Sequence, residues 1–208
     1  SIKKLTPNAI VIIVTNPLDL MTYYALKITG FSAARVFGMG ITLDASRFSN
    51  LISKELNVAV TDIEATVIGA HGEGMLPLPR LTNIKGIALD KFIAEAKLGN
   101  LIKMTLNRGQ EIVSLLGSGS AYFAPSAAVA EIVRAVIKDE KRVLGVSAYL
   151  KGEYGLKDVC IGVPSRLGRN GIEKIVELDL AREEKEALLQ SAAKLREQYD
   201  KLSPKNEL

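Results

Sequence analysis

The hydrophobic pattern of the chain begins with a continuous apolar run. Residues 9–14 are apolar and largely β-branched, which is typical of a strand buried on both faces of a parallel sheet. The run ends at residues 15–17 (Thr-Asn-Pro), residues 18–29 then follow helical spacing up to a glycine, and residues 35–40 predict a second short strand. This order of strand, helix and strand predicts part of an open α/β sheet.

The remaining pattern is a mixture of helical and alternating segments. A helix is predicted from Leu43, where the apolar residues form one stripe (Leu43, Phe48, Leu51, Ile52 and Leu56). Residues 63–69 predict a strand, which a glycine-rich loop and a Leu/Pro-rich segment follow. Further predicted elements are helices at about 93–116, 124–137 and 180–202, and an antiparallel hairpin of residues 143–150 and 158–163.

These elements predict a fold in two parts. The first is the α/β remnant of a parallel Rossmann-type sheet, and the second is an α+β domain with antiparallel strands and long helices. We place the boundary near Gly40, which gives parts of residues 1–40 and 41–208. The chain starts without Met, as if midway through a helix, and we therefore expect a fragment or a processed chain.

Composition narrows the class of protein only a little. The chain has 208 residues, 48% of them hydrophobic and 24% charged, as in an ordinary soluble globular protein. Its formal charge of +4 arises from scattered residues, so we expect no nucleic-acid partner, and no apolar run is long enough to cross a membrane. The only cysteine, Cys160, lies in an apolar run; it excludes an intramolecular disulfide and suits a cytoplasmic protein.

The only histidine of the chain, His71, lies in the glycine-rich stretch GAHGEG. Glycines on both sides allow tight turns and close approach of a ligand, so we expect an exposed loop at a functional site. A metal site is disfavoured, because neither a second histidine nor a suitable cysteine is present. A serine hydrolase motif is absent, and GSGSAYF lacks the Gly-Lys-Ser/Thr ending of a phosphate loop. General acid–base chemistry remains, with Asp44 as the carboxylate that orients the imidazole.

Two other motifs each allow a structural and a functional interpretation. Asn16 follows the carboxyl end of the first strand, where open α/β sheets bind ligands, but Asn16-Pro17 also fits a simple turn before a helix. Asp44 and Arg47 are three residues apart on one helical face and fit a surface salt bridge. Alternatively, Arg47 binds a carboxylate through two parallel N–H donors while Asp44 faces a neighbouring base.

Four motifs in this order, VTNPLD, LDASRF, GAHGEGMLPL and GSGSAYFAPSAA, resemble the lactate/malate dehydrogenases over nearly the whole chain. The resemblance implies NAD as the cofactor and makes Asn16, often followed by a cis proline in that family, a contact of both substrate and nicotinamide. Val14 and Thr15 would line the cofactor side. The Gly-rich dinucleotide fingerprint and the lid arginine of the family are absent from the chain.

The resemblance also implies a mechanism and a substrate. His71 would take the proton of the substrate C2 hydroxyl as hydride leaves C2, Asp44 would hold the other ring nitrogen, and Arg47 would clamp the C1 carboxylate. Gly119, where lactate enzymes usually have a bulkier threonine, favours malate, a substrate of the tricarboxylic acid cycle. Lactate or another 2-hydroxyacid is the alternative.

The resemblance implies partners as well. A small 2-hydroxy or 2-oxo acid is the expected substrate, and a homo-oligomer, either dimer or tetramer, is expected through the second part. Because the fingerprint is absent, we also consider a non-catalytic substrate or oligomerisation domain, which would assemble with itself or with a complementing dinucleotide-binding half.

Overall fold

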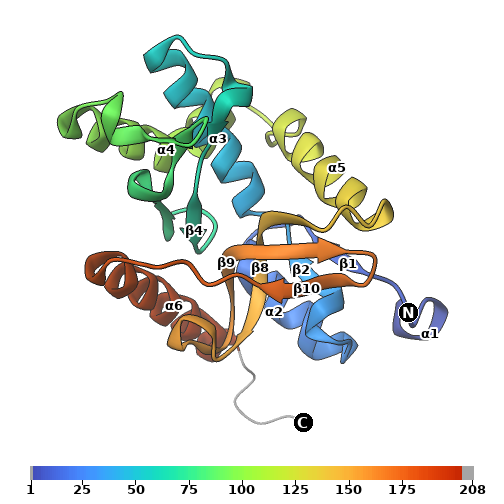
Figure 1. The fold of residues 1–208 in the computed structure, drawn as a ribbon. Coiled ribbons are helices and arrows are strands. Elements are labelled where there is room, and N and C mark those ends of the chain that lie inside the picture. Colours follow the sequence, from blue (N-terminus) through green and yellow to red (C-terminus); the bar gives the residue numbers. More distant parts are fainter. Residues whose placement is uncertain (1, 203–208) are drawn as a thin grey trace.

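The centre of the fold is one mixed sheet of seven strands (Figure 1). The computed structural model describes residues 2–202. Strands β1 (Val11–Ile13) and β2 (Val36–Gly38) are parallel, and β2 pairs in turn with β8 (Arg142–Lys151), which forms a long antiparallel pair with β9 (Lys157–Gly168). The parallel and antiparallel parts of the chain therefore share one hydrogen-bonded sheet.

The remaining strands extend this sheet or form a second, smaller one. β9 also pairs with β4 and β10, β4 forms a hairpin with β5, and β3, β6 and β7 form a separate three-stranded sheet. The bounds of these strands are β3 (Ile63–Glu64), β4 (Val67–Gly69), β5 (Met75–Pro77), β6 (Asn83–Ile84), β7 (Ile87–Ala88) and β10 (Gly171–Ile175).

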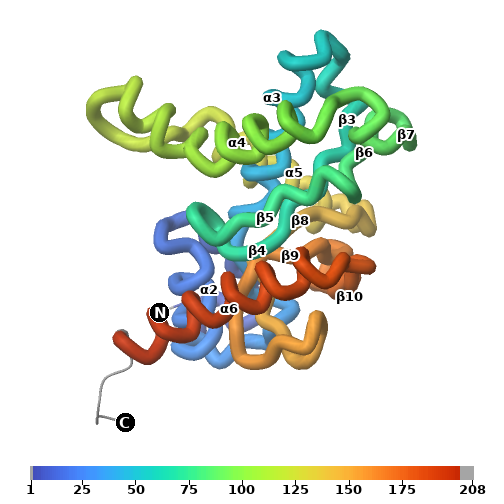
Figure 2. Tube along the Cα trace, turned by 90° about the vertical axis from the view of Figure 1, so that its left-hand side faces the viewer, coloured from blue at the N-terminus to red at the C-terminus, as the bar shows by residue number. Residues whose placement is uncertain are grey.

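Helices cover both faces of the large sheet. In Figure 1, α2 and α6 lie below the sheet and α3, α4 and α5 lie above it. Figure 2 shows α6 running beside α2 on one side of the molecule, with α3 and α4 together at the far end. The α-helices are α1 (Ile2–Leu5), α2 (Leu18–Thr29), α3 (Ile41–Leu56), α4 (Glu95–Leu116), α5 (Phe123–Ile137) and α6 (Arg182–Leu202). Short 3-10 helices are η1 (Ala33–Arg35), η2 (Val60–Asp62), η3 (Pro79–Leu81), η4 (Leu89–Lys91) and η5 (Glu153–Gly155).

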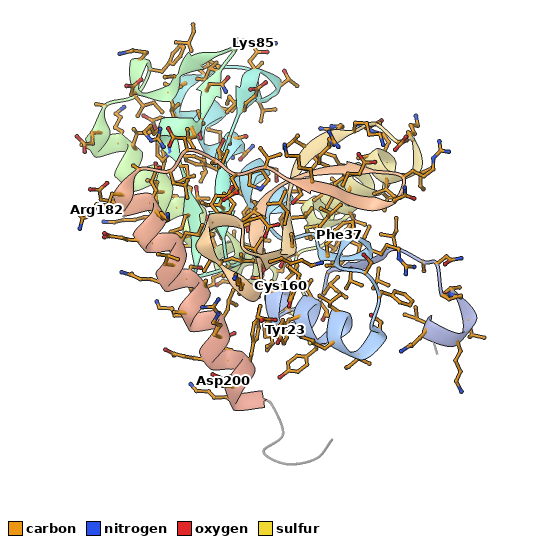
Figure 3. All side chains as sticks on the ribbon, turned by 60° about the horizontal axis from the view of Figure 1, so that its bottom comes forward. Tyr23, Phe37, Lys85, Cys160, Arg182 and Asp200 are labelled. Atoms are coloured by element: carbon orange, nitrogen blue, oxygen red, sulfur yellow. The ribbon has the colours of Figure 1, made fainter. Side chains whose placement is uncertain are left out.

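Aromatic packing joins α2 to α6 on the lower face. The rings of Tyr23 and Tyr199 stack with their centroids 4.1 Å apart, and Figure 3 shows Tyr23 beside the last turns of α6, near Asp200. The Tyr199 hydroxyl donates a hydrogen bond to the Cys160 carbonyl in β9. Cys160 itself is fully buried, as its apolar surroundings in the sequence predict.

The predicted fold class is confirmed, with differences in detail. The parallel strand pair, the α2 helix and the β8–β9 hairpin are present. The single strand predicted at 63–69 is two strands in two different sheets, and residues 65–66 between them belong to neither strand. The Leu/Pro-rich segment contributes β5. A further strand that the sequence did not predict, β10, follows β9 and pairs with it in antiparallel orientation. None of the helices in residues 2–202 is long and apolar enough to span a membrane.

Close packing of α3 against the sheet requires glycine on the strands beneath it. A Cβ added to Gly162 in β9 would lie 1.9 Å from Ile41 Cγ1 and 2.5 Å from the Gly69 carbonyl oxygen. A Cβ on Gly145 in β8 would lie 2.5 Å from Ile41 Cγ2. Because Ile41 is the first residue of α3, these glycines set how closely the start of that helix approaches the sheet.

We expect Gly162→Ala to destabilise the fold. Inserting a methyl group into a closely packed region costs about 1–3 kcal/mol, which lowers the melting temperature of a chain of this size by about 3–10 °C. Thermal unfolding followed by circular dichroism measures this change. Gly99→Ala in α4 is the matched control, because a Cβ at this position meets no atom within 4 Å. This substitution should stabilise the helix by about 0.5–1 kcal/mol. Equal melting temperatures for the two variants would contradict the packing argument.

Candidate active site

A cavity of about 630 Å³ opens where the first strand ends and the α4 and α5 helices approach it. Its size is that of a small-molecule site. Asn16, Arg47 and His71 all line it, although they are far apart in the sequence. Its other lining residues are Val14, Met39, Leu43, Gly72, Glu73, Met75, Leu106, Gly109, Gln110, Val113, Ser114, Ser120, Ala121 and Pro125.

The centre of the site is a hydrogen-bonded pair of His71 and Asp44. The distance between His71 Nδ1 and Asp44 Oδ2 is 2.7 Å, and the Asp44 side chain is completely buried. With Nδ1 engaged, Nε2 is the ring nitrogen that remains for a ligand. The histidine side chain is only 13% exposed, so the ring is mostly enclosed, although Glu73 of the same loop is exposed as predicted. The loop folds inward because α2, α3 and α6 all contact it, as described below.

The local backbone explains why these two side chains meet. Asp44 lies in the first turn of α3, where the helix dipole favours a negative charge. His71 lies in the loop that connects β4 to β5, and Gly69, the last residue of β4, precedes this loop with a φ of 93° that suits glycine. Gly40 precedes α3, and a Cβ there would lie 3.1 Å from His71 Cβ. A glycine at this position therefore allows the start of α3 to approach the histidine.

The charges around His71 favour its protonated form. Burial by itself lowers the pKa of His71, but the hydrogen bond and charge of Asp44, together with the charge of Asp19, outweigh burial and raise the pKa above its ordinary value of 6.5. Arg47 opposes this shift, because its positive charge lowers the pKa of the imidazole. The buried carboxylates thus favour the imidazolium form of His71.

We expect the NMR signals of His71 to titrate with a midpoint above pH 6.5. Because the folded pKa is raised, the protonated ring stabilises the fold fully below pH 6.5, and this contribution is lost as the pH rises through the folded pKa. His71 is the only histidine, so its signal is unambiguous. In Asp44→Asn the midpoint should move to lower pH, and an identical midpoint in both proteins would contradict the role of Asp44.

Arg47 is placed to bind an anion. Its side chain is 11% exposed, and its Nη1 donates to Asp44 Oδ1 at 3.2 Å. The ion pair considered from the sequence is therefore present, but it is largely buried and does not lie on the surface. Arg47 Nε is buried and has no hydrogen-bond partner among the described residues. A buried guanidinium with an unused donor suits a ligand that carries a carboxylate.

The other predicted site residues are only partly gathered at the cavity. Val14 and Asn16 line it, and the Asn16–Pro17 peptide bond is cis. Thr15 and Gly119 are not among its lining residues; Ser120 and Ala121, which follow Gly119, take that place. Val14, at the end of the first strand, is 43% exposed.

Sequence reasoning missed three residues that anchor the His71 loop. Asp19 Oδ2 accepts a hydrogen bond from the His71 backbone N–H at 2.7 Å, and Ser147 donates to the other oxygen of Asp19 at 2.6 Å. Ser191 in α6 accepts a hydrogen bond from the Ala70 N–H and donates to the Gly74 carbonyl. Asp19 belongs to the VTNPLD motif, but nothing in the sequence indicated its contact with the His71 loop. The two serines gave no signal in the sequence.

The geometry of His71, Asp44 and Arg47 limits the chemistry that the site can perform. A histidine held by a buried carboxylate is able to accept and return a proton, and the neighbouring arginine is able to bind an anion. Within residues 2–202, no cluster of three or more histidine, cysteine, aspartate or glutamate side chains could hold a metal ion.

Comparison with known proteins identifies the family. Residues 41–205 match the model described as lactate/malate dehydrogenase, alpha/beta C-terminal domain, and residues 1–38 match lactate/malate dehydrogenase, NAD binding domain. The chain therefore belongs to the lactate/malate dehydrogenase family, as its four motifs predict. The match to the NAD-binding domain also confirms NAD as the cofactor.

Curated relatives and solved structures agree with this assignment. The chain is 50% identical to a malate dehydrogenase of Methanosarcina mazei over 202 residues, which is 97% of this chain and 66% of the relative. It is 49% identical to one of Bacillus mycoides over 195 residues, 94% of this chain and 62% of the relative. The chain thus spans slightly less than two thirds of the length of these relatives.

Two solved structures show how far the fold similarity extends. A malate dehydrogenase from Salinibacter ruber superposes with a TM-score of 0.94 at 44% identity, covering 96% of this chain and 65% of that one. A lactate dehydrogenase from Eimeria maxima with NADH and oxamate superposes with a TM-score of 0.94 at 38% identity, covering 97% and 62%. Malate and lactate enzymes therefore share this fold.

Proposed function

We propose that the protein to which this chain belongs is an NAD-dependent malate dehydrogenase, which interconverts malate and oxaloacetate. The observation that carries the proposal is the His71–Asp44 pair beside Arg47 in one cavity. The relatives named malate dehydrogenase, at about 50% identity over most of the chain, favour malate as the substrate.

Each side chain has a separate task in this proposal. Arg47 binds the C1 carboxylate of the substrate through its planar guanidinium and so fixes the orientation of C2. Neutral His71 accepts the proton of the C2 hydroxyl at Nε2 during oxidation, and the protonated ring returns it during reduction. Asp44 keeps Nδ1 protonated and stabilises the imidazolium.

Asn16 and Val14 form the cofactor side of the cavity in this proposal, with Thr15 next to them in the chain. The Asn16 side-chain amide would contact both the substrate and the nicotinamide. When bound, NAD supplies the hydride chemistry, and the protein supplies orientation and proton transfer. Gly119 is proposed as a substrate-side residue through the turn that places Ser120 and Ala121 at the cavity.

A steady-state assay of the complete gene product tests the activity. Oxidation of NADH with oxaloacetate should be fast, and turnover with pyruvate should be weak. Failure with both substrates would contradict the proposed reaction. Preference for pyruvate would instead favour a lactate dehydrogenase, which the similarity to the Eimeria maxima enzyme keeps as the second candidate.

A non-catalytic assembly domain is the other alternative, and an NAD titration of the 208-residue chain tests it. Tight binding would contradict this alternative. We also propose the domain boundary near Gly40, supported by family matches that end at residue 38 and begin again at residue 41. We further propose that the protein forms a homo-oligomer. We also propose a cytoplasmic location, because the single cysteine, Cys160, is unpaired.

A further inference from the structure

Asp19 is a buried carboxylate to which the proposed reaction assigns no task. It lies in the first turn of α2, two residues after Pro17, and its side chain is almost fully enclosed. One of its oxygens accepts the His71 backbone N–H at 2.7 Å and the other accepts the Ser147 hydroxyl in β8 at 2.6 Å. A single carboxylate therefore connects α2, the central sheet and the His71 loop.

The surroundings of Asp19 are unusually rich in charge for a buried position. Asp44 and Arg47 face the region from α3, and a second cavity of about 240 Å³ borders Asp19 on the α6 side. The titratable and charged groups around Asp19 and His71 are Asp44, Arg47, Glu73, Cys160, Lys194 and Tyr199. Asp44 from this set and Asp19 itself are the carboxylates that raise the pKa of His71.

We propose that Asp19 is a positioning residue, which holds the His71 loop against the Asn16–Pro17 turn and adds a second negative charge that favours imidazolium. The placement follows from two short hydrogen bonds and from the position of Asp19 just after the turn. The relevance of the Asp19 charge to catalysis rests on the proposed acid–base role of His71. The effect of this charge on the pKa of the imidazole is independent of that role.

The ionised form of Asp19 is retained at a cost to stability. Burial raises the pKa of Asp19 from 3.8 to about 6, against the hydrogen bonds of Ser147 and His71, which lower it. A raised pKa means that the group stabilises the fold below pH 3.8 and that this contribution is lost as the pH rises through about 6. At pH 7 an asparagine could accept the same backbone hydrogen bond without a buried charge. Anchoring the loop alone therefore does not require a carboxylate.

The test is the variant Asp19→Asn in the 208-residue chain, with the NMR titration of His71 as the readout. We expect the titration midpoint to move to lower pH, while the denaturant midpoint of unfolding at pH 7 stays the same or rises. In the complete gene product, kcat/KM for oxaloacetate reduction should decrease as the pH rises, and in Asp19→Asn this decrease should begin at a lower pH than in the unmodified protein.

Two controls separate charge from anchoring. Ser191→Ala removes hydrogen bonds to the same loop but no charge, so it should leave the His71 midpoint in place. Asp90→Asn removes an exposed carboxylate and should change neither readout. If Asp19→Asn does not fold, Ser147→Ala replaces it. Loss of that hydrogen bond raises the pKa of Asp19, reduces its charge and should shift His71 in the same direction.

An unchanged titration midpoint of His71 in a folded Asp19→Asn protein would overturn the inference. If the variant were also less stable, the role of Asp19 would be purely structural. The titration needs no substrate or cofactor. Failure of oxaloacetate turnover with a shifted midpoint would therefore overturn the proposed function and leave the inference standing.

Discussion

His71→Asn in the complete gene product is expected to lower kcat for oxaloacetate reduction by about 10²- to 10⁴-fold, the usual contribution of a general acid. Asparagine can still donate a hydrogen bond to Asp44, so the buried carboxylate is not left without a partner. It cannot transfer a proton near pH 7. Steady-state kinetics with NADH and oxaloacetate measures the loss.

Binding of NADH separates proton transfer from a general disruption of the site. His71 lies in the β4–β5 loop, whereas Val14 and Asn16 form the proposed cofactor side. The dissociation constant of NADH, measured by fluorescence titration, should therefore change by less than about twofold, a free energy of about 0.4 kcal/mol. An equal loss of NADH affinity and of kcat would count against a proton-transfer role.

Arg47→Lys is expected to lower kcat/KM for oxaloacetate by about 100-fold, or about 2.7 kcal/mol, because lysine keeps the charge but loses the planar pair of donors. Most of this effect should be a higher KM, since the carboxylate is bound in the ground state as well. Arg47 Nη1 also contacts Asp44 at 3.2 Å, and a smaller reduction of kcat is expected from that lost support.

Arg182→Lys is the matched control for this prediction. Arg182 forms an ion pair with Glu186 on the surface of α6, where its side chain is 85% exposed (Figure 3). Exposed pairs of this kind contribute little, so the kinetics and the stability of this variant should equal those of the unmodified protein. A similar kcat/KM for Arg47→Lys and Arg182→Lys would show that Arg47 does not bind the substrate carboxylate.

The sequence predicted the elements of this fold better than their pairing. Local apolar patterns located α2, α4, α5 and α6 and the long hairpin, because each pattern reflects which face of one element is buried. Pairing of β2 with β8 joins residues more than 100 positions apart, through Gly38 and Ser147, and no local pattern encodes it. The short strands of the small sheet are two residues each, too few to show a period.

The site was predictable only where motifs provided a guide. His71, Asp44, Arg47 and Asn16 belong to the four quoted motifs, and the structure brings His71 and Asp44 within hydrogen-bond distance. The depth of the site was not predictable, because α4 and α5 complete the cavity from distant parts of the chain. The role of Asp19 depends on a contact with a backbone N–H 52 positions away.

The continuous sheet has a consequence for dissecting this chain. The family matches divide it between residues 38 and 41, but β2 pairs with β8 across that division, and Phe37 and Met39 belong to the same core as Val146 and Ile161. A gene divided at that point would yield two products, each with an unpaired strand edge and an uncovered apolar surface, which is the usual origin of aggregation. The boundary between the two family matches is therefore not a boundary between two independently folding units.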